Sequence, residues 1–236
     1  MVTTVFNPVC HSGMAKPHPP PKTTLHLSSS DKLRSWLSDD SNDPTTILSL
    51  HLTGQRGPHN WLQNNHSFLK ISSFLKVKSL TLVDPDLTSS DNISYATFKG
   101  FGPKLTSLSV ESATNVSAGA LSRLIERFSV LENLTIHNIS PGPQIPKITS
   151  QFRGKLTLSG ISEVSDPPSF WKTMEIAEMR LDNYRFHSQE RMEELFRACE
   201  KTLKKVELSN VSISISGDPR GSFHWRSRVF VEISHF

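Results

Sequence analysis

One short phrase with the spacing L-x-x-L-x-L recurs along the chain and limits what the chain can fold into. The copy at Leu203 reads LKKVELSNV, and its apolar residues Val206 and Leu208 alternate with polar ones, as in a strand with one buried face. The other copies are ILSLHLTG at Ile47, VKSLTLVD at Val77, LTSLSVES at Leu105, LENLTIHN at Leu131, KLTLSGI at Lys155, IAEMRLDN at Ile176 and the shorter LHL at Leu25. The sequence therefore predicts the same short strand many times over.

The distance between successive copies is nearly constant. Their fourth positions fall at residues 25, 50, 80, 108, 134, 156, 179 and 206, so the steps are 25, 30, 28, 26, 22, 23 and 27 residues. A period in this range indicates leucine-rich repeats. We therefore predict an α/β fold, a horseshoe-shaped solenoid with parallel strands on its inner face, helices outside and irregular repeats of about 22–30 residues.

The segments between these strands carry apolar residues at helical spacing. In SDKLRSWLSDD, Ser30 can cap a helix whose two leucines and tryptophan lie at i, i+3 and i+4. NNHSFLKISSFLKVKSL repeats the arrangement, and Ser117 and Ser188 precede the longer patterns AGALSRLIERF and QERMEELFRACEKTL. Cys199 lies on the apolar stripe of the last pattern, which favours a buried small hydrophobe over a reactive thiol.

The ninth position of the phrase departs from the regular leucine-rich repeat, which has an asparagine there. This chain has Gln55, Pro85, Ala113, Ile139, Ile161, Tyr184 and Val211 at the ninth position. Asparagines at successive ninth positions would form a ladder along the solenoid. Because this chain lacks such an asparagine ladder, we expect its repeats to be less regular than in an array of identical copies.

The two ends of the chain lack the repeat. Four prolines in AKPHPPPK favour polyproline II, so residues 1–23 are predicted to be a disordered linker. The repeats occupy residues 24–211. Residues 212–236 do not continue the repeat, and we expect them to form an irregular tail.

Composition and charge argue against several classes of partner. The chain has 26 basic and 22 acidic residues. One cluster of basic residues surrounds Trp225 and consists of Arg220, Arg226 and Arg228. We interpret it as an ordinary solvated end rather than a nucleic-acid site. No apolar run approaches the roughly 20 residues that a spanning helix needs. The N-terminus lacks the pattern of a secretory signal, and the two cysteines lie far apart. We expect a cytoplasmic or nuclear protein that binds neither nucleic acid nor membranes.

Enzyme motifs are missing from the sequence. It contains no G-x-S-x-G elbow, no G-x-x-x-x-G-K-[ST] phosphate loop and no H-E-x-x-H zinc helix. Cys10, His11 and His18 do not supply a closed set of four metal ligands. We therefore expect no enzymatic activity, no cofactor and no metal.

The inner face of the predicted sheet is the candidate binding surface, because alternation turns every second strand side chain toward it. Its first half is rich in hydroxyls, and its last half carries charges suited to charge-assisted contacts. The alternative for any one of these residues is a plain solvated position. The candidate partner-binding residues are His51, Thr81, Ser109, Glu111, Thr135, His137, Arg180, Asp182 and Glu207.

The repeats resemble those of one known family. DKLRSWL, ILSLHLTG, FSVLENLTIHNIS and RMEELFRACEKTLKKVELSN look like the long-period repeats of fungal, basidiomycete-type F-box proteins, in which an F-box precedes a divergent leucine-rich array. From Val9, VCHSGMAKPHPPPKTTLHLSSSDKLRSWL is similar to the end of an F-box that continues into the first repeat. In this alignment most of the F-box is missing, and residues 1–8 are too few to replace it.

The resemblance implies a non-catalytic role in ubiquitin ligation. The chain would be the substrate-recognition region of an SCF-type ligase, with a protein substrate on its concave face. A Skp adaptor would be a partner only where a functional F-box exists. The alternative is a stand-alone leucine-rich-repeat scaffold unrelated to ubiquitination.

Overall fold

The computed structural model is an α/β structure built around a largely parallel sheet, as the sequence predicts. It describes residues 23–55, 60–63, 70–85, 102–113, 125, 127–138, 152–160, 175–186, 188–214, 222–225 and 229–232. Within these residues the strands form one nine-stranded and one three-stranded sheet. The large sheet positions every residue of the candidate site.

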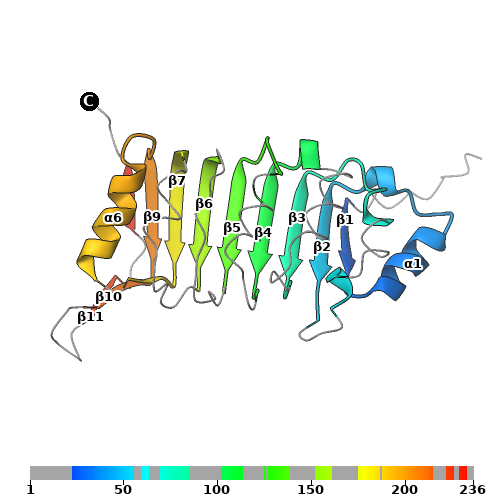
Figure 1. Cartoon of the computed structure of the whole chain (residues 1–236), viewed down its shortest axis with the longest axis horizontal. Coiled ribbons are helices and arrows are strands. Elements are labelled where there is room, and N and C mark those ends of the chain that lie inside the picture. Colours follow the sequence, from blue (N-terminus) through cyan, green and yellow to red (C-terminus); the bar gives the residue numbers. More distant parts are fainter. Residues whose placement is uncertain are drawn as a thin grey trace, which may run out of the picture.

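Eight strands of the large sheet lie side by side in chain order and run parallel (Figure 1). They are β1 (Thr24–Leu27), β2 (Ser49–Thr53), β3 (Ser79–Val83), β4 (Ser107–Glu111), β5 (Asn133–His137), β6 (Arg153–Ser159), β7 (Glu175–Asp182) and β9 (Lys205–Ser209). A ninth strand, β12 (Val229–Glu232), pairs antiparallel with β9. Each strand of the parallel series comes from one copy of the phrase.

From the third position onward the register of the sheet follows the phrase residue by residue, while a shift between Gly154 and Lys155 offsets the start of β6 against β7. The fourth positions form one continuous row of partners, Leu25, Leu50, Leu80, Leu108, Leu134, Leu156, Met179 and Val206. From Leu50 to Val206 every member of the row is buried. Because burying one such side chain contributes about 1.5–3 kcal/mol, the row fixes which face of the sheet is the core.

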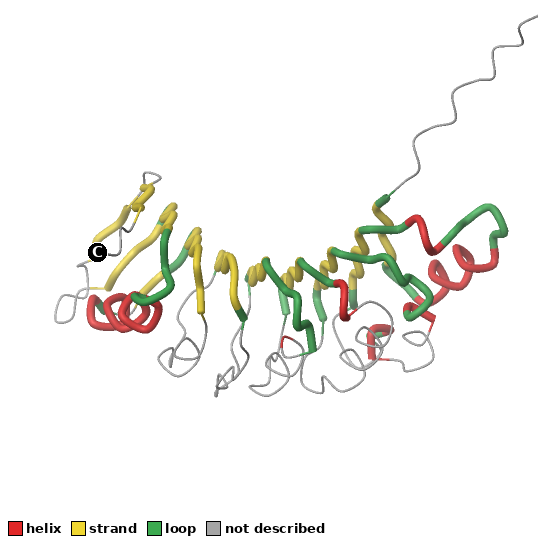
Figure 2. The backbone as a smooth tube through the Cα atoms, turned by 90° about the horizontal axis from the view of Figure 1, so that it is seen from above, coloured by secondary structure: helices red, strands yellow, loops and turns green. Residues whose placement is uncertain are grey.

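The sheet is curved, and its two faces differ. In Figure 2 the strands follow an arc, with the described helices and loops on the convex side. The α-helices with described bounds are α1 (Ser30–Ser38) and α6 (Gln189–Cys199), at opposite ends of the sheet (Figure 1). Short 3-10 helices are η1 (Pro44–Thr46), η2 (Trp61–Gln63) and η3 (Gly102–Lys104). Of the stretches 64–80 and 118–128, in which helices are predicted, residues 64–69, 118–124 and 126 lie outside the described residues.

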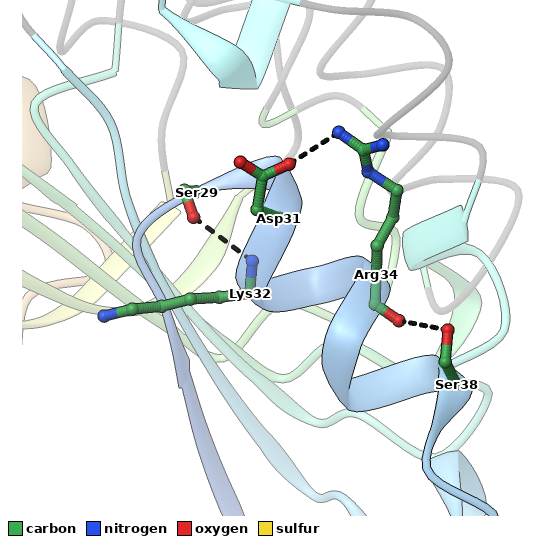
Figure 3. Close-up of polar contacts among 5 residues, drawn as sticks. All are labelled: Ser29, Asp31, Lys32, Arg34 and Ser38. Carbon is green, nitrogen blue, oxygen red and sulfur yellow. Dashed lines mark hydrogen bonds and ion pairs between the residues drawn. The ribbon is translucent and has the colours of Figure 1, made fainter.

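The cap of α1 lies one residue earlier than predicted. Ser29 has extended backbone, and its side chain accepts a hydrogen bond from the Lys32 amide at 3.2 Å, whereas Ser30 is already helical (Figure 3). Within the helix, Asp31 pairs with Arg34 at 2.6 Å, and the Ser38 hydroxyl donates to the Arg34 carbonyl. Consecutive serines make this boundary ambiguous in the sequence, because either hydroxyl can cap.

A left-handed residue at the eighth position ends most strands. These residues are Asp84 (φ 48°), Ser112 (55°), Asn138 (48°), Gly160 (62°), Asn183 (49°) and Asn210 (50°). The Asp84 amide donates to the Glu111 carbonyl at 2.9 Å, and the Ser112 amide to the His137 carbonyl at 2.8 Å. Glycine, asparagine and aspartate enter this conformation most easily, so the turn chemistry of the repeat sits one position before the ninth.

The ninth position, predicted to lack an asparagine ladder, is apolar in much of the sheet. Pro85, Ala113, Tyr184 and Val211 are buried there, while Gln55 is exposed. Ile139 and Ile161 lie outside the described residues. In four of the five described copies, apolar packing occupies the place that asparagine takes in regular repeats.

The tail expected to be irregular at 212–236 instead contains strands. β10 (Val211–Ser214) pairs parallel with β8 (Arg185–Phe186) and antiparallel with β11 (Ser222–Trp225). β12 joins the large sheet beside β9. A search for the L-x-x-L-x-L period cannot find these strands, because none of them carries the phrase, and β11 and β12 run antiparallel to the strands they join.

Candidate open-face binding site

The face of the sheet opposite the leucine core, here called the open face, carries two rows of side chains. The central row is His26, His51, Thr81, Ser109, Thr135, Thr157, Arg180 and Glu207. The second row, two residues further along each strand, is Thr53, Val83, Glu111, His137, Ser159, Asp182 and Ser209. Neighbours within a row are about 4.8 Å apart because they lie on adjacent strands.

All nine predicted binding residues lie in these rows. His51, Thr81, Ser109, Thr135, Arg180 and Glu207 are in the central row, and Glu111, His137 and Asp182 are in the second. All except Glu207 are partly exposed, while Glu207 is 7% exposed. The sheet therefore brings the nine together on one surface, although Glu207 is largely enclosed.

The middle of the central row is neutral and rich in hydroxyls. Thr81, Ser109, Thr135 and Thr157 follow one another in the central row on β3 to β6, each partly exposed. The Ser109 hydroxyl donates to the Glu111 carboxylate at 3.0 Å. Hydroxyls can donate and accept, so this stretch can bind polar groups of either kind.

Cross-strand ion pairs balance the charges where β6 and β7 begin. Arg153 Nε lies 2.6 Å from Glu175 Oε2, and Lys155 Nζ lies 3.9 Å from Glu178 Oε2. These side chains remain between 43% and 70% exposed, so each pair contributes about 0–1 kcal/mol. Their main effect is that each of these four charged side chains has an opposite charge beside it.

Arg180 differs from the other arginine of this region. Its Nε lies 3.6 Å from Glu207 Oε1, and this buried nitrogen makes no hydrogen bond. The Glu207 side chain is only 9% exposed, so solvent screens the pair weakly. A guanidinium carries five donors, which makes Arg180 the strongest candidate for bonding an acceptor on a partner.

Two histidines lie in contact at the β1 end of the central row. His26 and His51 are direct register partners, with ring centroids 4.7 Å apart and planes tilted by 40°. Burial lowers the pKa of His51, the neighbouring His26 lowers it further, and the Glu111 carboxylate acts in the opposite direction. His26 was missing from the predicted binding residues because LHL at Leu25 is only a shortened copy of the phrase. Its middle residue nevertheless occupies the same position as His51.

The lowered pKa of His51 predicts a pH effect. Since the unfolded chain binds this proton more readily, stability is full above the ordinary pKa of 6.5 and falls as pH drops through the lower folded pKa. We expect His51→Gln to lose less stability than wild type between pH 7 and pH 5 in urea unfolding. His137→Gln controls for loss of a histidine from the same face, and equal behaviour of the two variants would contradict the assignment.

Two buried titratable groups lie away from the open face. Burial raises the pKa of the Cys199 thiol to about 11 and that of Tyr184 to about 12. Cys199 is a free thiol, 1% exposed, which confirms its expected place in the core. A thiol with this pKa is a poor nucleophile at neutral pH.

Three further features bear on the site. Within the described segments, no group of three or more His, Cys, Asp or Glu side chains could hold a metal ion. None of the described helices is long and apolar enough to cross a membrane. The arginines of the predicted solvated cluster, Arg220, Arg226 and Arg228, lie outside the described residues.

Comparison with known proteins adds no relative. No protein-family model, curated protein or solved structure matches this chain.

Proposed function

We propose that the chain is an irregular leucine-rich-repeat solenoid of horseshoe type, and that its open face binds a protein partner. The period of about 26 residues, the in-register parallel strands and the curved sheet support this architecture. Irregular repeat length and the apolar ninth position make it a divergent example. Solenoids of this kind use their concave surface for recognition.

The observation that carries the proposal is the pair of polar rows on the open face. Eight strands at about 4.8 Å spacing give a surface roughly 34 Å long, which suits an interface of about 800 Å² per partner. The hydroxyls of the middle strands supply neutral hydrogen bonds, and Arg180 supplies charged donors. In Figure 2 the described helices and loops leave this side uncovered.

The link to ubiquitin ligation is a narrower proposal within this one. It rests on the resemblance of the repeats to those of F-box proteins, and residues 1–22, which would hold the F-box remnant, lie outside the described residues. Co-expression with a Skp-type adaptor tests it. Co-purification would support the ligase role, and separate elution of the two proteins would leave the stand-alone scaffold.

A cross-linking experiment tests partner binding by the open face. We expect a photo-reactive amino acid at Thr135 to give a discrete adduct in cells of the source organism, and the same group at Glu193 on α6 to give none. Adding Arg180→Ala should reduce the adduct by about tenfold, equivalent to ~1.4 kcal/mol, because it removes charged donors.

Arg153→Ala is the matched control, because the Arg153 guanidinium is already paired with the Glu175 carboxylate. It should leave the adduct unchanged. Adducts from Glu193 alone, or equal effects of the two arginine substitutions, would contradict binding at this surface.

A further inference from the structure

Two imidazole rings stand side by side at the β1 end of the open face. His26 and His51 are paired across adjacent parallel strands, and their ring centroids are 4.7 Å apart. The backbone pairing of β1 with β2 sets the two residues opposite each other, because both lie within regular strands. The two side chains therefore leave adjacent strands at matching positions before any ligand arrives.

The ring nitrogens of both residues are available. Neither imidazole donates or accepts a hydrogen bond with another described residue, and His26 is exposed while His51 is partly exposed. His137, by contrast, has its Nε2 at 2.9 Å from Asn138 Nδ2. The two imidazoles of the pair are therefore free of hydrogen bonds to the described residues, whereas that of His137 is not.

We propose that His26 and His51 together form a two-histidine site for a divalent transition-metal ion of the Zn²⁺ or Cu²⁺ class. Imidazole nitrogen is a preferred ligand of both ions, whereas Mg²⁺ and Ca²⁺ prefer oxygen. Two protein ligands leave the remaining coordination positions to water. The site lies at the edge of the described sheet, where β1 has a strand neighbour on one side only.

The other groups near the pair are compatible with a bound cation. Thr81 follows His51 in the central row and is neutral. The Glu111 carboxylate acts electrostatically on His51 and would favour a positive charge there. No cationic side chain occupies the central row before Arg180, far along the sheet.

Zinc titration of the full chain, followed by imidazole ¹⁵N NMR, tests the site. We expect the signals of His26 and His51 to shift together and at lower Zn²⁺ than those of the other histidines. His26→Gln and His51→Gln should each weaken this binding by about tenfold or more, and the double variant little further, because one imidazole alone cannot chelate. His137→Gln should bind as wild type.

Protons compete with the metal for the same nitrogens, which gives a second readout. Binding at the pair should weaken as the pH falls from 7 to 5, and EDTA should restore the metal-free spectrum. Signals of the pair that move no earlier than those of the other histidines, or a double variant that binds Zn²⁺ as wild type does, would overturn the proposal.

Discussion

Leu134→Asp is expected to unfold the sheet or to lower its free energy of unfolding by roughly 3–5 kcal/mol. Leu134 lies on the central strand β5, is fully buried, and pairs with Leu108 on one side and Leu156 on the other. An aspartate there would place a carboxylate without a partner in the continuous leucine row. Urea unfolding followed by circular dichroism measures the loss.

Thr135→Asp is the matched control, because the next residue on the strand points to the open face. It introduces the same charge on the same strand and should cost less than about 1 kcal/mol. Burial raises the pKa of a carboxyl group, so the Leu134→Asp variant should also regain stability as the pH falls toward 4. A folded Leu134→Asp protein of wild-type stability would mean that the buried face is assigned wrongly.

The leucine spacing was sufficient to predict the eight parallel strands, and it explains the register of their apolar positions. A period-two pattern inside each copy defines the buried face, and a one-residue slip would expose every leucine, so only one alignment of copies is acceptable. This is why Leu50, Leu80 and Leu108 pair as their positions in the phrase predict. The same logic placed all nine candidate residues on the open face.

The features that were missed do not depend on the apolar period. The turn residues stand at the eighth position, where Asp84 and Asn183 adopt left-handed backbone. The asparagine of the regular repeat stands at the ninth position, so comparison with that repeat does not point to them. β12 was missed because it returns antiparallel to β9. Such non-repeating contacts depend on tertiary pairing, which a repeat pattern does not contain.

Side-chain pairing on the open face was also beyond the sequence. Alternation places Arg153 and Arg180 on one surface, but which of them has its donors satisfied depends on neighbours in other repeats. The structure pairs Arg153 with Glu175 by two short contacts and leaves Arg180 with one long contact to Glu207. This difference makes Arg180 the better candidate for partner binding and Arg153 its control.

Asn60→Ala is expected to lower the free energy of unfolding by about 2–4 kcal/mol, through buried polar groups rather than lost apolar area. Asn60 is 4% exposed, and its Nδ2 donates to the Asp84 carbonyl at 3.1 Å while its Oδ1 accepts from the Leu62 amide at 3.1 Å. It thus joins the turn after β3 to the segment that follows β2. Alanine would leave the amide of the fully buried Leu62 without this acceptor.

Asn42→Ala provides the comparison for Asn60→Ala. Asn42 also donates from Nδ2 to a backbone carbonyl, that of Trp36 at 3.0 Å, but it is partly exposed and water can replace the bond. Its loss should cost no more than about 1 kcal/mol. If thermal or urea unfolding gave the two variants equal losses, the Asn60 bridge would be no more than a surface hydrogen bond. A larger loss for Asn60→Ala would show that this asparagine ties two neighbouring repeats together, a role that regular repeats assign to the ninth position.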